Sequence, residues 1–140
     1  GSVRTPGVTF DDGRTLGGYH NLSHHGKDEV KLSRLEEIET AQMELFGEFL
    51  RDLKSVNEVD GNLLDNTMVL YGCHMGDANI HNNSNLPVIL AGGGFQHGQH
   101  LTFNSQNNTP LCNVFVSMLQ KMGVETDRFA SSTGSLTGLV

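Results

Sequence analysis

The chain has 140 residues, of which 36% are hydrophobic, and a formal net charge of −7, which suits one compact domain or one piece of a larger one. It has no run of lysine and arginine, so nucleic acid and an anionic membrane surface are excluded as expected partners. No apolar stretch reaches the ~20 residues that a transmembrane helix needs.

The N-terminal segment is expected to contribute little regular structure. Gly1 and Ser2 resemble a cloning scar, so the natural start is expected to lie elsewhere, and residues 3–140 are expected to form a single α/β region. Residues 1–18 are predicted to be loop, with a short strand near Val8–Phe10. The polar segment 19–26 that follows is turn-like.

A helix from about Leu32 to Val56 is the strongest structural prediction. Its apolar residues recur at spacings of three or four and form one stripe: Leu35, Ile38, Ala41, Leu45, Phe49 and Leu53. Ser33 and Glu36 fit a capping box at its start. We expect the stripe to face the core and the charged opposite face to be solvated.

Three β-rich runs are predicted in the second half of the chain. Thr67–Tyr71 and Leu86–Ala91 are expected to be buried strands, because each is apolar and is followed by glycine. Asp60–Asn62 marks a turn before the first of them. Gln99–Phe103 is expected to be a third, shorter strand.

A second helix is predicted over Pro110–Met122, with Gly123 as its C-terminal cap and a loop from Ser131 onward. Helices that alternate with short strands indicate an α/β fold. In open α/β sheets, ligands bind beyond the carboxyl ends of the strands. Segment Gly72–His81 occupies that place after the first clear strand.

Two histidine-rich segments carry the residues suited to chemistry. His20 and His24 are four positions apart, which puts both rings on one side of a helical turn or on a tight loop that can hold a metal. Zinc, iron, manganese and nickel suit imidazole ligands. His25 is adjacent and is expected to point elsewhere. The alternative is that these are surface histidines in a loop.

Asp77 and His81 repeat this spacing in the second segment. With His20 and His24 they give three histidines and one carboxylate, a normal ligand set for a hydrolytic metal. The alternative is that Asp77 satisfies backbone groups in a turn, as aspartate often does.

Cys73 and His74 could act as nucleophile and base. Adjacent residues rarely point toward one another, however, and no third orienting group is evident. Cys73 and Cys112 are expected to be small buried residues. The absence of a CxxC pattern excludes a disulfide scaffold and a zinc ribbon.

The run Gly92–Gly94 is expected to turn the chain sharply. It lacks the lysine and the spacing of a phosphate-binding loop. His97 and His100, which follow it, are expected to be exposed and are reserve ligands.

Several segments in combination resemble the C-terminal part of an uncharacterised bacterial family, domain of unknown function 1552. They are Tyr19–Gly26, Leu63–Gly72, Met75–His81, Leu86–Gly94 and Ser132–Gly134 with Leu136. The resemblance covers nearly the whole chain after residue 15. That family is grouped with the alkaline-phosphatase-like superfamily of phosphatases, sulfatases and phosphoglycerate mutases.

The resemblance implies a partial three-layer α/β/α sandwich with metal ligands at strand ends. It assigns His20 and His24 as one ligand pair and His81 as a further ligand. Cys73 and His74 occupy the place of an Asp-His pair, so the acidic ligand is lost there and Asp77 comes later. The nucleophile and the first acidic ligand are expected in an N-terminal half outside this chain.

Three interpretations therefore stay open. The first is the C-terminal part of an exported or periplasmic, metal-dependent phosphate or sulfate ester hydrolase that is inactive alone. The second is a binding or cell-surface protein with the fold but not the chemistry, and the third is a self-contained metal-binding module. The predicted ligands are His20, His24, Asp77 and His81, with His25, Cys73 and His74 as secondary candidates.

The implied cofactor is a divalent metal ion, namely zinc, manganese or calcium. The implied partner is the missing N-terminal half. Homo-oligomers of the isolated chain are also expected, because strands left without their neighbours expose edges that associate.

Overall fold

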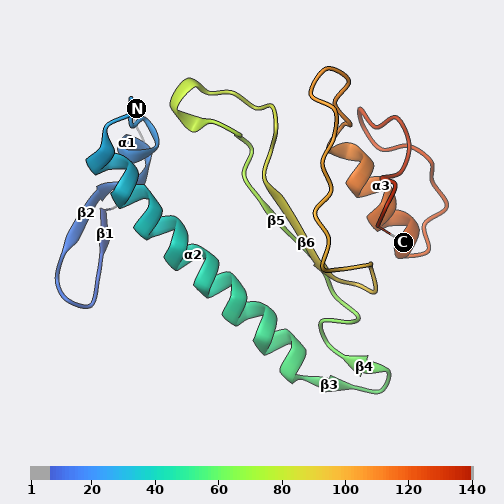
Figure 1. The fold of residues 1–140 in the computed structure, drawn as a ribbon. Coiled ribbons are helices and arrows are strands. Elements are labelled where there is room, and N and C mark those ends of the chain that lie inside the picture. Colours follow the sequence, from blue (N-terminus) through green and yellow to red (C-terminus); the bar gives the residue numbers. More distant parts are fainter. Residues whose placement is uncertain (1–6, 140) are drawn as a thin grey trace. The chain divides into compact units, whose positions relative to one another are not determined.

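The computed structural model describes residues 7–139 (Figure 1), and the loop expected over residues 1–6 lies outside this range. The chain combines helices with small antiparallel sheets, as the α/β prediction requires at its coarsest level. Within the described residues, the strands form three two-stranded sheets, β1–β2, β3–β4 and β5–β6. The elements in chain order are β1 (Gly7–Thr9), β2 (Thr15–Gly18), α1 (Tyr19–Ser23), α2 (Glu29–Ser55), β3 (Asn57–Glu58), β4 (Gly61–Asn62), β5 (Met68–Gly72), η1 (Ala78–Ile80), β6 (Val88–Gly92) and α3 (Cys112–Lys121).

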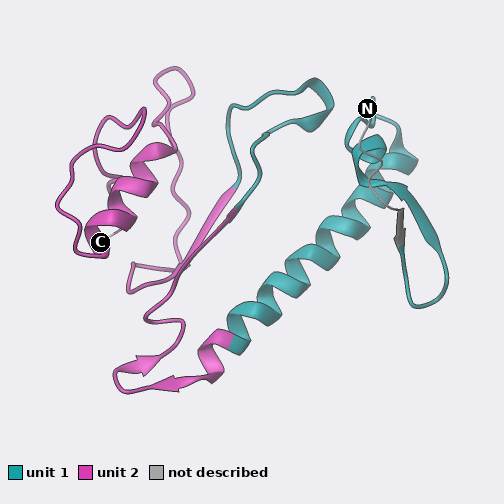
Figure 2. Cartoon of the chain, turned by 180° about the vertical axis from the view of Figure 1, so that it is seen from behind, with its two compact units in different colours: residues 1–52, 72–87 teal, residues 53–71, 88–140 magenta. Residues whose placement is uncertain are grey.

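Two compact units divide the chain (Figure 2). The first contains the described residues up to Asp52 together with Gly72–Pro87. The second contains Leu53–Tyr71 and the chain from Val88 onward. None of the helices within residues 7–139 is long and apolar enough to cross a membrane.

The first unit begins with the hairpin β1–β2, whose register pairs Thr9 with Thr15. Gly13, at φ +81°, completes the turn between the strands. The short strand expected near Val8–Phe10 is confirmed. The loop expected for residues 15–18 is wrong, because β2 pairs with β1 and buries Leu16.

The long helix α2 starts three residues earlier than its apolar pattern predicts. The Asp28 carboxylate accepts a hydrogen bond from the Lys31 backbone N–H at 2.9 Å, which is the contact of an N-cap residue. The predicted capping box at Ser33 and Glu36 is therefore wrong, since both residues lie inside the helix. Ile38 of α2 is buried against Leu16 and Leu22, and these three form the core of the first unit.

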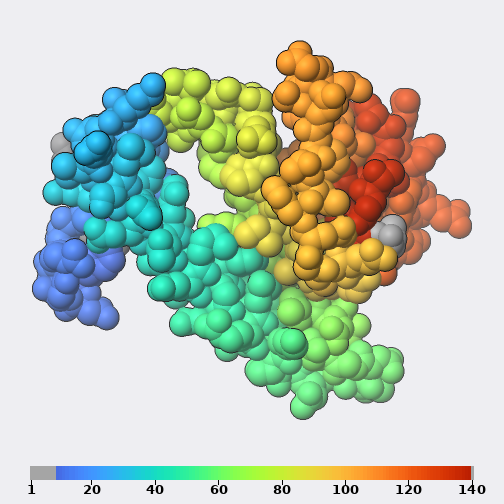
Figure 3. Space-filling model, in the orientation of Figure 1, coloured from blue at the N-terminus to red at the C-terminus, as the bar shows by residue number. Residues whose placement is uncertain are grey.

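Only part of the predicted apolar stripe on α2 is covered. Ile38 is 4% exposed, whereas Leu45 and Phe49 are 65% and 48% exposed. Much of the surface of α2 (cyan to green) is accordingly visible in Figure 3. The expectation of a continuous core-facing stripe is wrong for its second half, because the buried clusters of the described residues do not include those positions.

The two central predicted strands are present as the hairpin β5–β6. The Cys73 N–H, just after β5, donates to the Pro87 carbonyl, just before β6, at 3.3 Å, so the strands run antiparallel. They are less buried than predicted: β5 is half-buried, and Val88 and Ile89 are exposed. Each strand has a single hydrogen-bonded neighbour within its sheet.

The strand predicted over Gln99–Phe103 is wrong, because this segment is irregular. The Gln99 side-chain amide donates to the carbonyls of Gln96 and Gly138. These two side-chain hydrogen bonds hold the segment in a loop conformation.

Gly92–Gly94 turn the chain after β6, as the sequence predicts. All three have positive φ, at +72°, +63° and +68°. A Cβ atom at Gly92 would clash with the carbonyl oxygens of Leu64 and Thr67. Glycine is therefore required at position 92, where the backbone turns with positive φ and passes close to other backbone atoms.

The second unit is built around α3, which confirms the predicted second helix. Gly123, at φ +82°, follows its end. Val114 of α3 packs in a buried cluster with Phe95, Leu136 and Leu139. The segment from Ser131 is loop, as predicted, yet it supplies two of the four residues of this core.

Candidate metal centre

The first unit brings His20 and His24 together at the end of α1. His20 lies within α1, and His24 is its C-terminal cap residue. Their ring centroids are 4.8 Å apart, with the planes 76° from parallel. This confirms the expectation that the spacing of four places both rings on one side of a helical turn.

His81 joins these two from a loop more than fifty residues later. Its ring centroid lies 4.8 Å from that of His24, and the two Nε2 atoms are 3.2 Å apart. One Nε2 can donate to the other when the two rings adopt opposite tautomers. The His24 ring therefore contacts both the His20 and the His81 rings, and we call these three imidazoles the histidine cluster.

The loop that carries His81 is closed by its own backbone. Asp77 and Asn82 form an isolated antiparallel bridge, with Asn82 N to Asp77 O at 2.9 Å and Asp77 N to Asn82 O at 3.2 Å. His81 itself is left-handed, at φ +54° and ψ +36°. A non-glycine residue in this conformation costs of order 1–3 kcal/mol and often marks a functional site.

Asp77 acts as a capping residue. Its Oδ1 accepts a hydrogen bond from the Asn79 N–H at 2.9 Å, and it is the N-cap of η1. The alternative in which Asp77 satisfies backbone groups in a turn is thus observed.

The His25 ring is engaged elsewhere, as its position next to His24 predicts. Its Nδ1 accepts a hydrogen bond from the Lys27 N–H at 3.0 Å. Its carbonyl accepts one from the Asp28 N–H at 2.9 Å. His25 therefore shapes the turn between α1 and α2.

Lys31 of α2 fastens the carbonyl end of α1. Its Nζ donates to the carbonyl oxygens of His24 and Asn21, at 3.2 and 3.4 Å. A cation is favourable at the carbonyl end of a helix. The sequence does not single out Lys31, because a lysine in a charged helix face carries no signal for such a contact.

Cys73 and His74 are both exposed. The expectation of a buried Cys73 is wrong, because the residue lies just past the end of β5, where its backbone pairs but its thiol faces solvent. Cys112 is half-buried and accepts a hydrogen bond from the Ser131 hydroxyl. His97 and His100 are exposed, as expected, and His97 Nε2 lies 3.0 Å from the Gly92 carbonyl.

Across residues 7–139, no three histidine, cysteine, aspartate or glutamate side chains are arranged as a ready metal site. Of the four predicted ligands, the three histidines lie together in the histidine cluster, and the fourth, Asp77, acts as a capping residue. The Nε2 atoms of His24 and His81 lie 3.2 Å apart.

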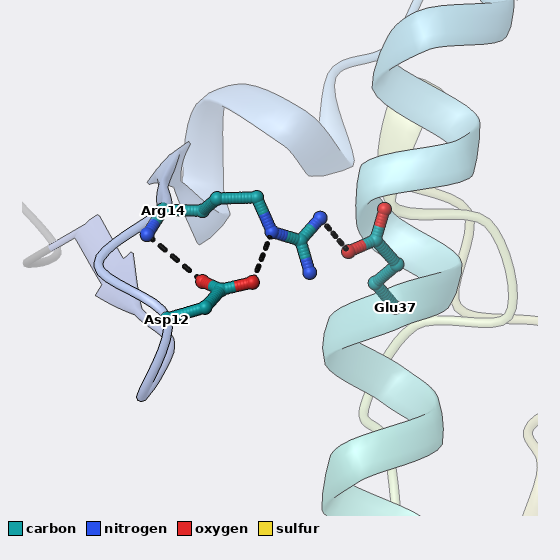
Figure 4. Close-up of polar contacts among 3 residues, drawn as sticks. All are labelled: Asp12, Arg14 and Glu37. Carbon is teal, nitrogen blue, oxygen red and sulfur yellow. Dashed lines mark hydrogen bonds and ion pairs between the residues drawn. The ribbon is translucent and has the colours of Figure 1, made fainter.

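A separate cluster of charged residues in the first unit is centred on Arg14 (Figure 4). Arg14 Nε lies 2.7 Å from the Asp12 carboxylate, and its Nη1 lies 3.5 Å from that of Glu37 on α2. Hydrogen bonds from the Arg14 backbone N–H and guanidinium lower the pKa of Asp12 below its usual 3.8. Chiefly through its hydrogen bond to Asp12, the pKa of Arg14 is raised.

The chain was compared with protein-family models, curated proteins and solved structures, and none of them matches it.

Proposed function

We propose that His24 and His81 bind a divalent metal ion, zinc in the first instance, with His20 as the third ligand. The 3.2 Å separation of the two Nε2 atoms carries the proposal. Two nitrogens that each lie 2.0–2.1 Å from a tetrahedral zinc ion are about 3.3 Å apart, so this pair has the required spacing. The left-handed backbone of His81 supports a functional reason for its place.

His20 is the natural third ligand because its ring already lies against that of His24. Its side chain is exposed, so a metal ion can reach it from solvent. Three histidines with one open position are a common shell for catalytic zinc. Asp77 stays a predicted fourth ligand, which would have to give up its bond to the Asn79 N–H or bind through its other oxygen.

We further propose that the site belongs to a metal-dependent phosphate or sulfate ester hydrolase of the alkaline-phosphatase-like type, with this chain as its C-terminal part. A metal ion there would polarise an ester oxygen or activate the nucleophile. On this proposal the nucleophile and the first acidic ligand lie outside these 140 residues, and the chain completes a three-layer α/β/α sandwich with them. The family resemblance and the convergence of its three assigned histidines support this.

The second candidate is a non-catalytic protein that keeps the fold. The observation that favours it is the exposed Cys73 at the position where the superfamily has an acidic ligand. Turnover of aryl phosphates or sulfates by the longer protein with zinc, manganese or calcium, abolished by His20→Ala, would exclude it.

Calorimetric titration of the 140-residue chain with zinc tests the metal site. We expect one site of micromolar or tighter affinity, which weakens at least tenfold in His24→Ala and in His81→Ala. His100→Ala, which removes an exposed histidine of the second unit, is the matched control and should bind like the wild type. Equal affinity in all four proteins would overturn the proposal.

A further inference from the structure

We propose that Asn79 is a positioning residue for the histidine cluster. Its side chain ties the loop that carries His81 to the turn that follows His24. The consequence for metal binding rests on the proposed function, whereas the positioning itself is a property of the metal-free protein.

A hydrogen bond from a backbone N–H to a side chain joins the two segments next to the histidine cluster. Asn79 Oδ1 accepts from the Gly26 N–H at 2.8 Å, across 53 positions of the sequence. Gly26 lies two residues after His24, and Asn79 lies two residues before His81. The bond therefore sits beside both rings whose Nε2 atoms are 3.2 Å apart.

Asn79 is itself held in place from its own side. Its backbone N–H donates to Asp77 Oδ1 at 2.9 Å, and the backbone bridge between Asp77 and Asn82 closes the loop around it. The His81 N–H donates to the Ala78 carbonyl within the same turn. Within this loop, the Asp77 carboxylate accepts from the Asn79 backbone N–H, and the Asn79 side-chain oxygen accepts from the Gly26 N–H.

The other side of the bond is equally fixed. Gly26 follows His25, whose ring and carbonyl hold the N–H groups of Lys27 and Asp28. Lys31 holds the His24 carbonyl. A constraint on the Gly26 N–H therefore acts on His24 through only two intervening peptide units.

Substitutions at position 79 can distinguish a positioning role from a general effect on folding. The interaction needs only an acceptor oxygen at Oδ1, and aspartate supplies one with the same geometry, whereas alanine supplies none. Asn79→Asp should therefore keep the hydrogen bond from the Gly26 N–H, which we call the tie, whereas Asn79→Ala removes it. Asn83→Ala, which changes an exposed asparagine of the same loop, is the matched control.

Two measurements on the 140-residue chain test the proposal. Without metal, the nuclear Overhauser contacts between the ring protons of His24 and His81 and the exchange rate of the Gly26 amide report the tie. With zinc, calorimetry reports the affinity. We expect Asn79→Ala to lose the ring contacts and to speed Gly26 exchange at least tenfold. It should weaken zinc binding about tenfold or more, because the two ligands are no longer held together before the metal binds. Asn79→Asp should restore the contacts and the slow exchange, and Asn83→Ala should change none of the readouts.

The outcomes separate this proposal from the proposed function. Ring contacts that persist in Asn79→Ala, confirmed as folded by circular dichroism, would overturn the positioning role even if zinc binds. Ring contacts that depend on Asn79 in a wild-type chain that binds no zinc would uphold the positioning role and overturn the metal site.

Discussion

The Nε2 atoms of His24 and His81 lie 3.2 Å apart although 57 positions separate the two residues in the sequence. This contact brings two histidine-bearing segments of the first unit together in the candidate site. It arises from a short helix on one side and a backbone-closed loop on the other.

The left-handed backbone of His81 gives the first prediction. Replacement by glycine and replacement by alanine remove the same imidazole. A φ of +54° is unfavourable for alanine but not for glycine. We expect His81→Gly to be more stable than His81→Ala by about 1 kcal/mol, since a left-handed L-residue costs roughly 1–2 kcal/mol. Urea unfolding measures the difference, and an alanine variant as stable as the glycine variant would show that the backbone relaxes.

Parts of this site were accessible from the sequence because they depend on local spacing. The spacing of His20 and His24 predicts that their rings share a side of one turn, and the structure confirms it. The tie between Asn79 and Gly26 has no such signal, because it is a tertiary contact between two polar loops.

The same division applies to the fold. The periodicities of α2 and α3 predict these helices, because each is long enough to show its repeat. The apolar runs followed by glycine predict β5 and β6. β2 and the exposed second half of the α2 stripe were mispredicted. A four-residue strand has too little alternation to detect, and apolar spacing alone does not say whether another element covers a helix face.

Gly92 gives the second prediction. A Cβ atom there would clash with the backbone carbonyls of Leu64 and Thr67, and φ is +72°. We expect Gly92→Ala to lower the free energy of unfolding by about 2–4 kcal/mol, since it combines backbone strain with overpacking. Gly98→Ala is the control: φ is +78°, but no atom lies within 4 Å of the added Cβ, so the loss should be only about 1 kcal/mol. Equal losses in urea unfolding would contradict the steric argument.

Asn113 gives the third prediction, on how the C-terminal loop is held. Its buried side chain accepts from the Thr133 N–H at 2.9 Å and donates to the Thr133 hydroxyl at 3.2 Å. Asn113→Ala leaves that N–H without its partner, so we expect a loss of about 1–3 kcal/mol and faster exchange of the Thr133 amide. Thr133→Val removes only the hydroxyl and should keep the slow exchange. If Asn113→Ala kept it too, the side chain would not be the anchor.

Asp12 and Arg14 give the last prediction, which concerns pH. Because the hydrogen bonds from Arg14 lower the pKa of Asp12 in the folded chain, ionised Asp12 stabilises the fold above its usual pKa of 3.8. This contribution is lost as the pH falls below 3.8 through the lowered value. In carboxyl-detected NMR titrations, Asp12 should therefore titrate below 3.8 in the wild type and closer to 3.8 in Arg14→Leu. Glu37→Gln removes the more distant partner of Arg14, at 3.5 Å, and should leave the Asp12 titration nearly unchanged. An Arg14→Leu variant with the wild-type Asp12 curve would show that the hydrogen bond from Arg14 Nε to Asp12 drawn in Figure 4 does not hold in solution.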